Sequence, residues 1–216
     1  THVGGSLMSS GLIDTRFVDA LATSEPTPGG GSAAAVAGTI AAALLSMVCN
    51  LTVGQEKFAD VEAELAAVLR ETEAIRQELT ELAERDMAAY RSFVGAQRLP
   101  RTDAEERRAR ATCMQAALRD CTSVPLQIAQ RCRRLLDLAP LVAEKGNPSA
   151  VTDVGVGALL ADACMRGAGL QVRVNLAWLK DAEFASSQAA ELERTLEGAA
   201  TVKDKALAAV AAVMAG

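Results

Sequence analysis

The sequence predicts an all-α fold: an elongated helical bundle with a central, buried, alanine-rich helix and a long amphipathic helix. Three observations support this prediction. Half of the 216 residues are apolar, yet aromatic residues make up only 3% of the chain. Alanine is the most frequent residue, and alanine favours helices, whereas aromatic residues favour strands. Finally, long segments repeat apolar residues with helical spacing, and no segment of any length alternates as a strand does.

The net charge and the cysteine content limit which binding partners and which cellular compartment we expect for the protein. The net charge of −5 is opposite to the basic footprint of nucleic-acid-binding proteins, so we expect neither a nucleic-acid nor a membrane partner. An odd number of cysteines without a C-x-x-C pair predicts buried thiols in a reducing compartment, the cytoplasm. These cysteines are Cys49, Cys113, Cys121, Cys132 and Cys164.

The domain boundaries follow from the start of the chain. Residues 1–10 resemble an expression scar followed by a flexible N-terminus, and residues 11–216 form a single helical domain. The scar contains His2, the one histidine of the chain. Without a native histidine we expect no Ser-His or Cys-His couple and no metal site, so acid–base chemistry falls to other side chains.

The first half of the chain predicts three helices. A short amphipathic helix covers 14–24, and a proline- and glycine-rich loop separates it from an apolar helix over 33–48. Sixteen residues fall short of the roughly 20 that span a membrane, so the second helix is interpreted as the core of a bundle. The third helix, over 55–94, would be roughly 60 Å long. The bundle is therefore elongated, or this helix is broken, or it packs on a second subunit.

The second half predicts further helices separated by prolines. Pro100 ends the long helix, and Thr102 or Asp103 caps the next one, which runs to Leu138 with an interruption at Pro125. A loop over 145–149 follows. From residue 152 the chain is helical again, with one segment to about residue 180 and charged helices beyond it.

One acidic residue breaks the apolar stripe of the long helix. The stripe comprises Val61, Leu65, Val68, Thr72, Ile75, Leu79, Leu82, Asp86, Ala89 or Tyr90, and Phe93. A buried carboxylate is costly, and burial raises its pKa, which would allow Asp86 to accept and return a proton near neutral pH. The alternatives are that Asp86 pairs with an arginine across the bundle, or that the helix bends and exposes it.

Two loops are candidate ligand sites. In the first, Gly29, Gly30 and Gly31 allow close approach of a ligand, and Ser32 is a good N-cap whose neighbouring N–H groups favour an oxygen ligand. In the second, over 146–153, Thr152 or Asp153 caps the next helix. Capping alone explains the first loop at least as well as a ligand does, and for Asp153 capping is the favoured explanation, with a ligand contact as the alternative. Among the remaining polar side chains, Tyr90 lies one turn from Asp86, while Lys57 and Arg173 are typical of surface residues and Trp178 of a packing anchor.

Several motifs, in order along nearly the whole chain, resemble the formimidoyltetrahydrofolate cyclodeaminase family. They are Phe17–Leu21, Pro28–Ala35, Val124–Leu126, Asn147–Val156 and Arg166–Leu176. Relatives often carry Asn where Ser149 and Gln171 stand here. The resemblance implies an all-helical, cytosolic, metal-free homodimer that binds a folate substrate in a cleft and needs no cofactor. The family's catalytic aspartate lies in an Asp-x-x-Ala-Phe/Tyr context, which matches Asp86 here.

The resemblance implies a reaction. In the cyclodeaminase reaction N10 of 5-formimidoyltetrahydrofolate attacks the formimidoyl carbon, 5,10-methenyltetrahydrofolate forms, and ammonia leaves. Asp86 would carry the protons. The glycine loop, Ser32 and Asn147 would contact the substrate, as would Tyr90 and Asp153, with Lys57 and Arg173 as carboxylate clamps. One alternative is a methenyltetrahydrofolate cyclohydrolase, which yields 10-formyltetrahydrofolate, and another is a non-catalytic helical interaction module.

Overall fold

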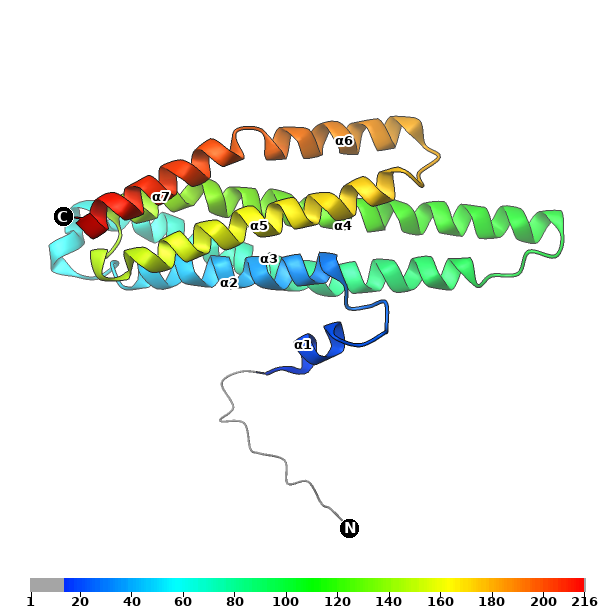
Figure 1. Cartoon of the computed structure of the whole chain (residues 1–216), viewed down its shortest axis with the longest axis horizontal. Helices are drawn as coiled ribbons and strands as arrows, with labels where there is room; N and C mark the ends of the chain where they lie inside the picture. The colour runs from blue at the N-terminus through cyan, green and yellow to red at the C-terminus, as the bar shows by residue number, and fades with distance from the viewer. Residues whose placement is uncertain (1–13, 216) are drawn as a thin grey trace, which may run out of the picture.

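The computed structural model describes residues 14–215, and within that range it is all-helical, without a β-strand. Helices α2 to α5 lie side by side in an elongated bundle, α6 and α7 cover one side of it, and α1 lies apart from the bundle (Figure 1). The predicted fold class is therefore confirmed. The elements are α1 Arg16–Leu21, α2 Gly30–Asn50, η1 Glu56–Val61, α3 Glu62–Gln97, α4 Ala104–Lys145, η2 Pro148–Ala150, α5 Val151–Leu176, α6 Ala182–Leu196 and α7 Ala199–Ala215.

Helix α2 is the apolar helix of the sequence prediction, and it packs against α3, α4 and α5. By length and composition alone it could cross a membrane, but half of its most apolar window is buried inside the bundle. Its small side chains let the neighbouring helices approach closely: a Cβ at Gly38 would meet Sγ of Cys132 at 2.9 Å. Its outer face is uncovered in the single chain, where Ile40 and Met47 are exposed.

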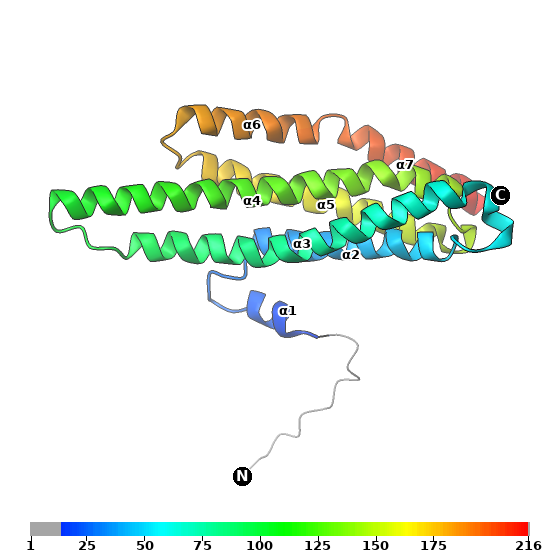
Figure 2. The same ribbon diagram turned by 180° about the vertical axis from the view of Figure 1, so that it is seen from behind.

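The long amphipathic helix is present with a break near its start. The chain forms the 3-10 helix η1 and turns at Phe58 (φ −117°, ψ 16°) before α3 begins. At 1.5 Å per residue, the 36 residues of α3 and the 42 of α4 span about 54 and 63 Å. The bundle is therefore elongated, and the α3–α4 hairpin projects beyond the other helices (Figures 1 and 2).

Helix α4 corrects one prediction, because neither Pro125 nor Pro140 interrupts it. Proline lacks the N–H that would bond the carbonyl four residues earlier, which for Pro125 is that of Cys121. The side-chain amide of Asn175 on α5 donates to this carbonyl at 2.5 Å. A tertiary hydrogen bond thus replaces the missing helical one, and the helix continues.

The helix ends confirm one predicted cap and correct others. The Asp103 carboxylate accepts from the N–H of Glu106 at 2.8 Å, so Asp103 caps α4 as predicted. Helix α5 already begins at Val151, after the short helix η2, so Thr152 and Asp153 lie inside its first turn and do not cap it. It ends at Leu176, slightly earlier than predicted.

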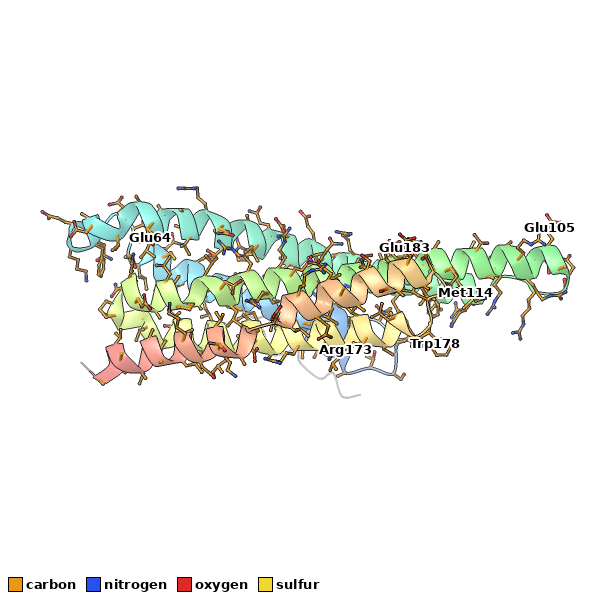
Figure 3. All side chains as sticks on the ribbon, turned by 90° about the horizontal axis from the view of Figure 1, so that it is seen from above. Glu64, Glu105, Met114, Arg173, Trp178 and Glu183 are labelled. Atoms are coloured by element: carbon orange, nitrogen blue, oxygen red, sulfur yellow. The ribbon has the colours of Figure 1, made fainter. Side chains whose placement is uncertain are left out.

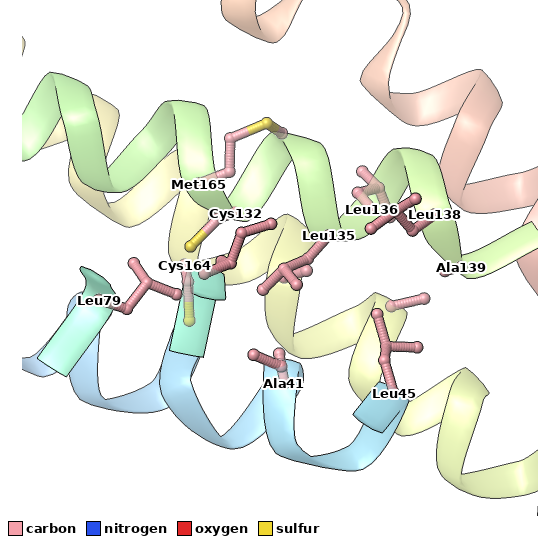
Figure 4. Close-up of a cluster of buried hydrophobic side chains, with 14 of the residues drawn as sticks. Ala41, Leu45, Leu79, Cys132, Leu135, Leu136, Leu138, Ala139, Cys164 and Met165 are labelled. Carbon is pink, nitrogen blue, oxygen red and sulfur yellow. The ribbon is translucent and has the colours of Figure 1, made fainter. Parts of the chain in front are cut away.

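The core fills the middle of the bundle with medium-sized aliphatic side chains, as the scarcity of aromatic residues requires. Leu79 of α3 and Leu135 of α4 are fully buried, and they meet small α2 residues such as Ala41 (Figure 4). Cys132 and Cys164 both lie within this cluster. Four of the five cysteines are buried as predicted, while Cys113 is exposed on the projecting part of α4.

Candidate active site

A cleft of about 300 Å³ opens where α2 begins, at the point from which the α3–α4 hairpin projects. Its walls come from the loop before α2 and from α3, α4 and α5. The structure thereby brings Asp86 and Tyr90 together with Gly29, Gly30 and Gly31, five of the residues that the sequence nominated. The three glycines lie more than 50 residues before Asp86 and Tyr90 in the sequence, and the two groups meet because α2 and α3 pack side by side.

Asp86 lies directly against the backbone of the glycine loop. A Cβ placed on Gly31 would lie 2.2 Å from Oδ1 of Asp86, a distance at which no side chain fits. The backbone N–H of Ser32, one of the unpaired donors at the start of α2, lies near enough to the carboxylate to lower its pKa. Glycine at position 31 therefore creates the space in which the carboxyl contacts the N-terminus of α2.

The environment of Asp86 raises its affinity for a proton. The carboxyl is half-buried, and burial raises its pKa above the usual range, while the Ser32 N–H opposes part of that rise. None of the ion pairs in residues 14–215 includes Asp86, so the structure shows no arginine partner of the kind considered as an alternative. A carboxyl with a raised pKa at the wall of a cleft is suited to accept and return a proton.

Ser32 differs from its predicted position as the N-cap. Gly29 is the N-cap of α2, and Ser32 is the third helical residue, fully buried. Its hydroxyl accepts from the N–H of Gly29 at 3.1 Å and donates to the Gly29 carbonyl at 3.0 Å. The side chain therefore holds the glycine loop in shape, and it is the backbone N–H of Ser32 that reaches Asp86.

Helix α5 supplies a wall that the sequence analysis missed. Gln171, Val174 and Asn175 line the cleft. Nε2 of Gln171 lies 2.9 Å from where a Cβ on Gly30 would be, so the absence of a side chain at Gly30 makes room for this amide. Two amides four residues apart on a helix share one face, and this spacing was the signal available in the sequence.

Two further lining groups come from Thr27 and Cys121. Oγ1 of Thr27 is buried and has no hydrogen-bond partner within residues 14–215. Burial and then the nearby Asp86 charge raise the pKa of the Cys121 thiol to about 11, so it stays protonated at neutral pH. Cys121 is therefore a neutral wall residue and no nucleophile.

Four nominated residues lie outside this cleft. Asn147 is at the other end of α2, about 30 Å away by helical rise, where its amide donates to the Leu51 carbonyl at 3.1 Å. Lys57, over the ring of Phe58, and Asp153, in the first turn of α5, lie towards the same end. Arg173 is on α5 but pairs with Glu193 of α6. The structure does not bring these four to Asp86 within one chain.

Comparison with known proteins identifies the family. Residues 14–194 match the family described as formiminotransferase-cyclodeaminase. The chain belongs to this family. A methenyltetrahydrofolate cyclohydrolase of Methylorubrum extorquens is 46% identical over 189 residues, which are 88% of this chain and 91% of that protein. The chain is accordingly an enzyme of the cyclodeaminase and cyclohydrolase family of folate one-carbon metabolism.

Two further comparisons show how much of the related proteins this chain covers and which fold it shares with them. The formimidoyltransferase-cyclodeaminase of Gallus gallus is 31% identical over 85% of this chain, which spans about a third of that longer protein (34%). The crystal structure of the formiminotetrahydrofolate cyclodeaminase of Thermotoga maritima superposes with a TM-score of 0.83 at 28% identity and covers 94% of this chain and 98% of that one. The family fold is therefore shared along nearly the whole chain.

Proposed function

We propose that the chain hydrolyses 5,10-methenyltetrahydrofolate to 10-formyltetrahydrofolate. The observation that carries the proposal is the position of Asp86, the one charged side chain among the described residues that line the cleft. The methenyl bridge is a cationic carbon between N5 and N10, and an anionic carboxylate is complementary to it. The 46% identity to a methenyltetrahydrofolate cyclohydrolase, over 91% of that protein, favours hydrolysis over the cyclodeaminase reaction that the sequence analysis placed first.

The first chemical step is the addition of water to the methenyl carbon. Asp86 accepts a proton from the water as its oxygen bonds to this carbon, and the positive charge of the bridge is neutralised. The raised pKa of Asp86 makes it a stronger base than an exposed aspartate. Holding the water between the carboxylate and the carbon removes much of the entropic part of the barrier.

The second step opens the ring. The bond between N5 and the former methenyl carbon breaks, and Asp86 returns its proton to N5. The hydroxyl on the carbon loses its proton to solvent and becomes the formyl carbonyl on N10, so one proton is released in each turnover. Since the two steps consist of water addition and proton transfers, the proposal names no cofactor.

The cleft walls would hold the pteridine ring. The carbonyl and N–H groups on the edge of this ring pair with primary amides, and Gln171 supplies one at the cleft wall. Gly29, Gly30 and Gly31 let the flat ring approach the backbone, and Tyr90 lines the same cleft. Binding roles for Ser32, Lys57, Asn147, Asp153 and Arg173 stay predictions from the family resemblance.

Cyclodeamination of 5-formimidoyltetrahydrofolate is the second candidate. It is favoured by the superposition on the Thermotoga maritima cyclodeaminase. The same carbon reacts: N10 attacks it in place of water, and ammonia leaves. Asp86 would take the N10 proton and give one to the departing nitrogen, so the cleft requires no additional group.

Substitution of Asp86 by Asn tests both candidates, because Asn keeps the shape and loses the base. We expect kcat with either substrate to fall about 10²-fold or more, the range attributed to a general base. The melting temperature should still rise with 5-formyltetrahydrofolate, a non-reactive analogue of the substrate. Glu84→Gln, an exposed neighbour on α3, is the matched control. A mutant that retains activity within threefold of the wild type would remove Asp86 from the chemistry.

The pH profile gives a second measurement on the same pair of proteins. Because burial raises the pKa of Asp86, the acidic limb of wild-type kcat/KM should lie above the usual aspartate value of about 3.9. Activity is lost as pH falls through this limb, since the base becomes protonated. A limb that is unchanged in the residual activity of Asp86→Asn would assign it to another group.

We also propose a cytoplasmic homodimer, in which α2 and α5 of two copies meet. These two helices pack together, and each exposes apolar side chains: Ile40 and Met47 on α2, and Val156 and Leu159 on α5. Helix α2 has a hydropathy that suits full burial, and only half of its apolar window is buried in the single chain. A second copy supplies an identical apolar face, as symmetric dimers do.

A further inference from the structure

Trp178, the single tryptophan of the chain, does not pack in the core as the sequence analysis expected. It is 68% exposed, more than any other exposed large apolar residue in the described chain. Figure 3 shows it at the turn between α5 and α6, near the α4 segment that carries Met114. Exposing an indole forfeits a large amount of favourable burial, and tryptophans in such positions are typical of binding sites.

The position of Trp178 relates it to the cleft. Gln171, Val174 and Asn175 line the cleft wall formed by α5. Trp178 lies three residues after Asn175, in the turn that begins where α5 ends at Leu176. The backbone of Trp178 therefore follows directly after the cleft wall that α5 forms.

The backbone around Trp178 is fixed on both sides. Its N–H donates to the Asn175 carbonyl at 3.0 Å. Its carbonyl accepts from the side-chain amide of Gln115 on α4 at 3.1 Å, and the oxygen of that amide accepts from the N–H of Lys180 at 2.8 Å. One glutamine thus pins the turn to α4, so the exposed indole stands on an ordered support.

The cleft holds only part of the proposed substrate. Its 300 Å³ lies at the lower end of the range for pockets that enclose a drug-sized ligand, and a folate also carries an aminobenzoyl ring and a glutamate beyond its pteridine. With the pteridine beside Asp86, the aminobenzoyl ring on N10 must leave the cleft. We propose, on the basis of the proposed function, that Trp178 is the platform on which this aminobenzoyl ring stacks.

The platform has a consequence for the reaction as well as for affinity. The aminobenzoyl ring is bonded directly to N10, one of the two nitrogens that flank the reacting carbon. Stacking the ring on an indole held by the α4–α5 contact fixes the direction of the N10 bond relative to Asp86. Trp178 acts on the substrate by contact and orientation, and it takes no part in proton transfer.

Intrinsic fluorescence tests the contact directly, because Trp178 is the one tryptophan of the chain. On titration with 5-formyltetrahydrofolate, we expect the emission to shift to shorter wavelength or to be quenched, with the midpoint found by calorimetry. An unchanged emission, while calorimetry or melting shows binding, overturns the platform and leaves the proposed function intact. A wild type that binds no folate overturns the proposed function itself. Emission that instead changes with protein concentration alone assigns Trp178 to an interface between copies.

Substitution supplies a readout on catalysis. We expect Trp178→Ala to raise KM about tenfold, the ratio that 1.4 kcal/mol of stacking produces, with a smaller effect on kcat. Trp178→Phe should recover most of the loss, because a phenyl ring still stacks. Met214→Ala, an equally exposed apolar site on α7, is the control for general surface effects. A tetrahydropterin without the aminobenzoyl ring should bind wild type and Trp178→Ala equally, and a KM unchanged in the alanine variant contradicts the proposal.

Discussion

The absence of a Cβ at Gly31 determines where the Asp86 carboxyl lies. The closest approach of the Asp86 carboxyl to the chain of α2 occurs where any side chain would add a Cβ only 2.2 Å from Oδ1. The carboxyl thereby reaches the N–H of Ser32 and stays half-buried, which raises its pKa. The glycine sets both the position and the basicity of the proposed base.

Gly31→Ala should therefore reduce activity without unfolding the protein. Alanine is favoured over glycine in helices, but here its methyl group must displace the carboxyl by more than an ångström. Misplacement on that scale can cost about 10²-fold in rate, and we expect a fall in kcat/KM of that size with cooperative melting retained.

Gly95→Ala is the matched control, since a Cβ at Gly95 of α3 meets nothing within 4 Å. It should keep wild-type activity and gain about 0.5–1 kcal/mol of stability from helix propensity. Full activity in Gly31→Ala would show that the close contact is irrelevant to the reaction.

At the scale of elements, α4 depends on α5 for its continuity. Pro125 leaves the Cys121 carbonyl without a helical donor, and the amide of Asn175 supplies one. The proline and the amide both line the cleft, so the same contact that keeps α4 straight holds the two cleft walls together. The local sequence around Pro125 indicates an interrupted helix, and a residue 50 positions later reverses that outcome.

A double-mutant cycle tests this dependence. Asn175→Leu leaves a buried carbonyl unpaired and should lower the free energy of unfolding by about 1–2 kcal/mol, measured by urea denaturation. In a Pro125→Ala background the N–H of residue 125 can bond the Cys121 carbonyl, and the same substitution should cost less than half as much. Equal costs in both backgrounds would show that the two groups act independently.

At the scale of the whole molecule, apolar side chains remain exposed on α2 and α5, where we propose that a second copy binds. The core lies between α2, α3, α4 and α5, and the apolar outer faces of α2 and α5 remain exposed on the flank that α6 and α7 do not cover. Contiguous apolar surfaces of this kind are typical of protein interfaces. The cleft lies at one end of this surface, because Gly30 and Gln171 belong to the same two helices.

Charged substitutions on this surface should separate the copies. We expect wild-type protein to sediment as a dimer and the double variant Ile40→Glu, Leu159→Glu to sediment as a monomer with retained helicity, because burying two carboxylates per chain opposes association. Val18→Glu on α1, also exposed, should leave the dimer intact. A wild type that is monomeric at micromolar concentration, or a dimeric double variant, would contradict the proposed interface.

The sequence by itself determined the helical fold class, the elongated shape, the family and the identity of Asp86 as an irregularity, because these follow from local periodicity and ordered motifs. Only the tertiary structure decided that Pro125 lies inside a helix, that Gln171, Asn175 and Thr27 join the cleft, and that Asn147 lies about 30 Å away. Those outcomes depend on contacts between residues distant in sequence. Local patterns carry no information about which helices meet, or at which end.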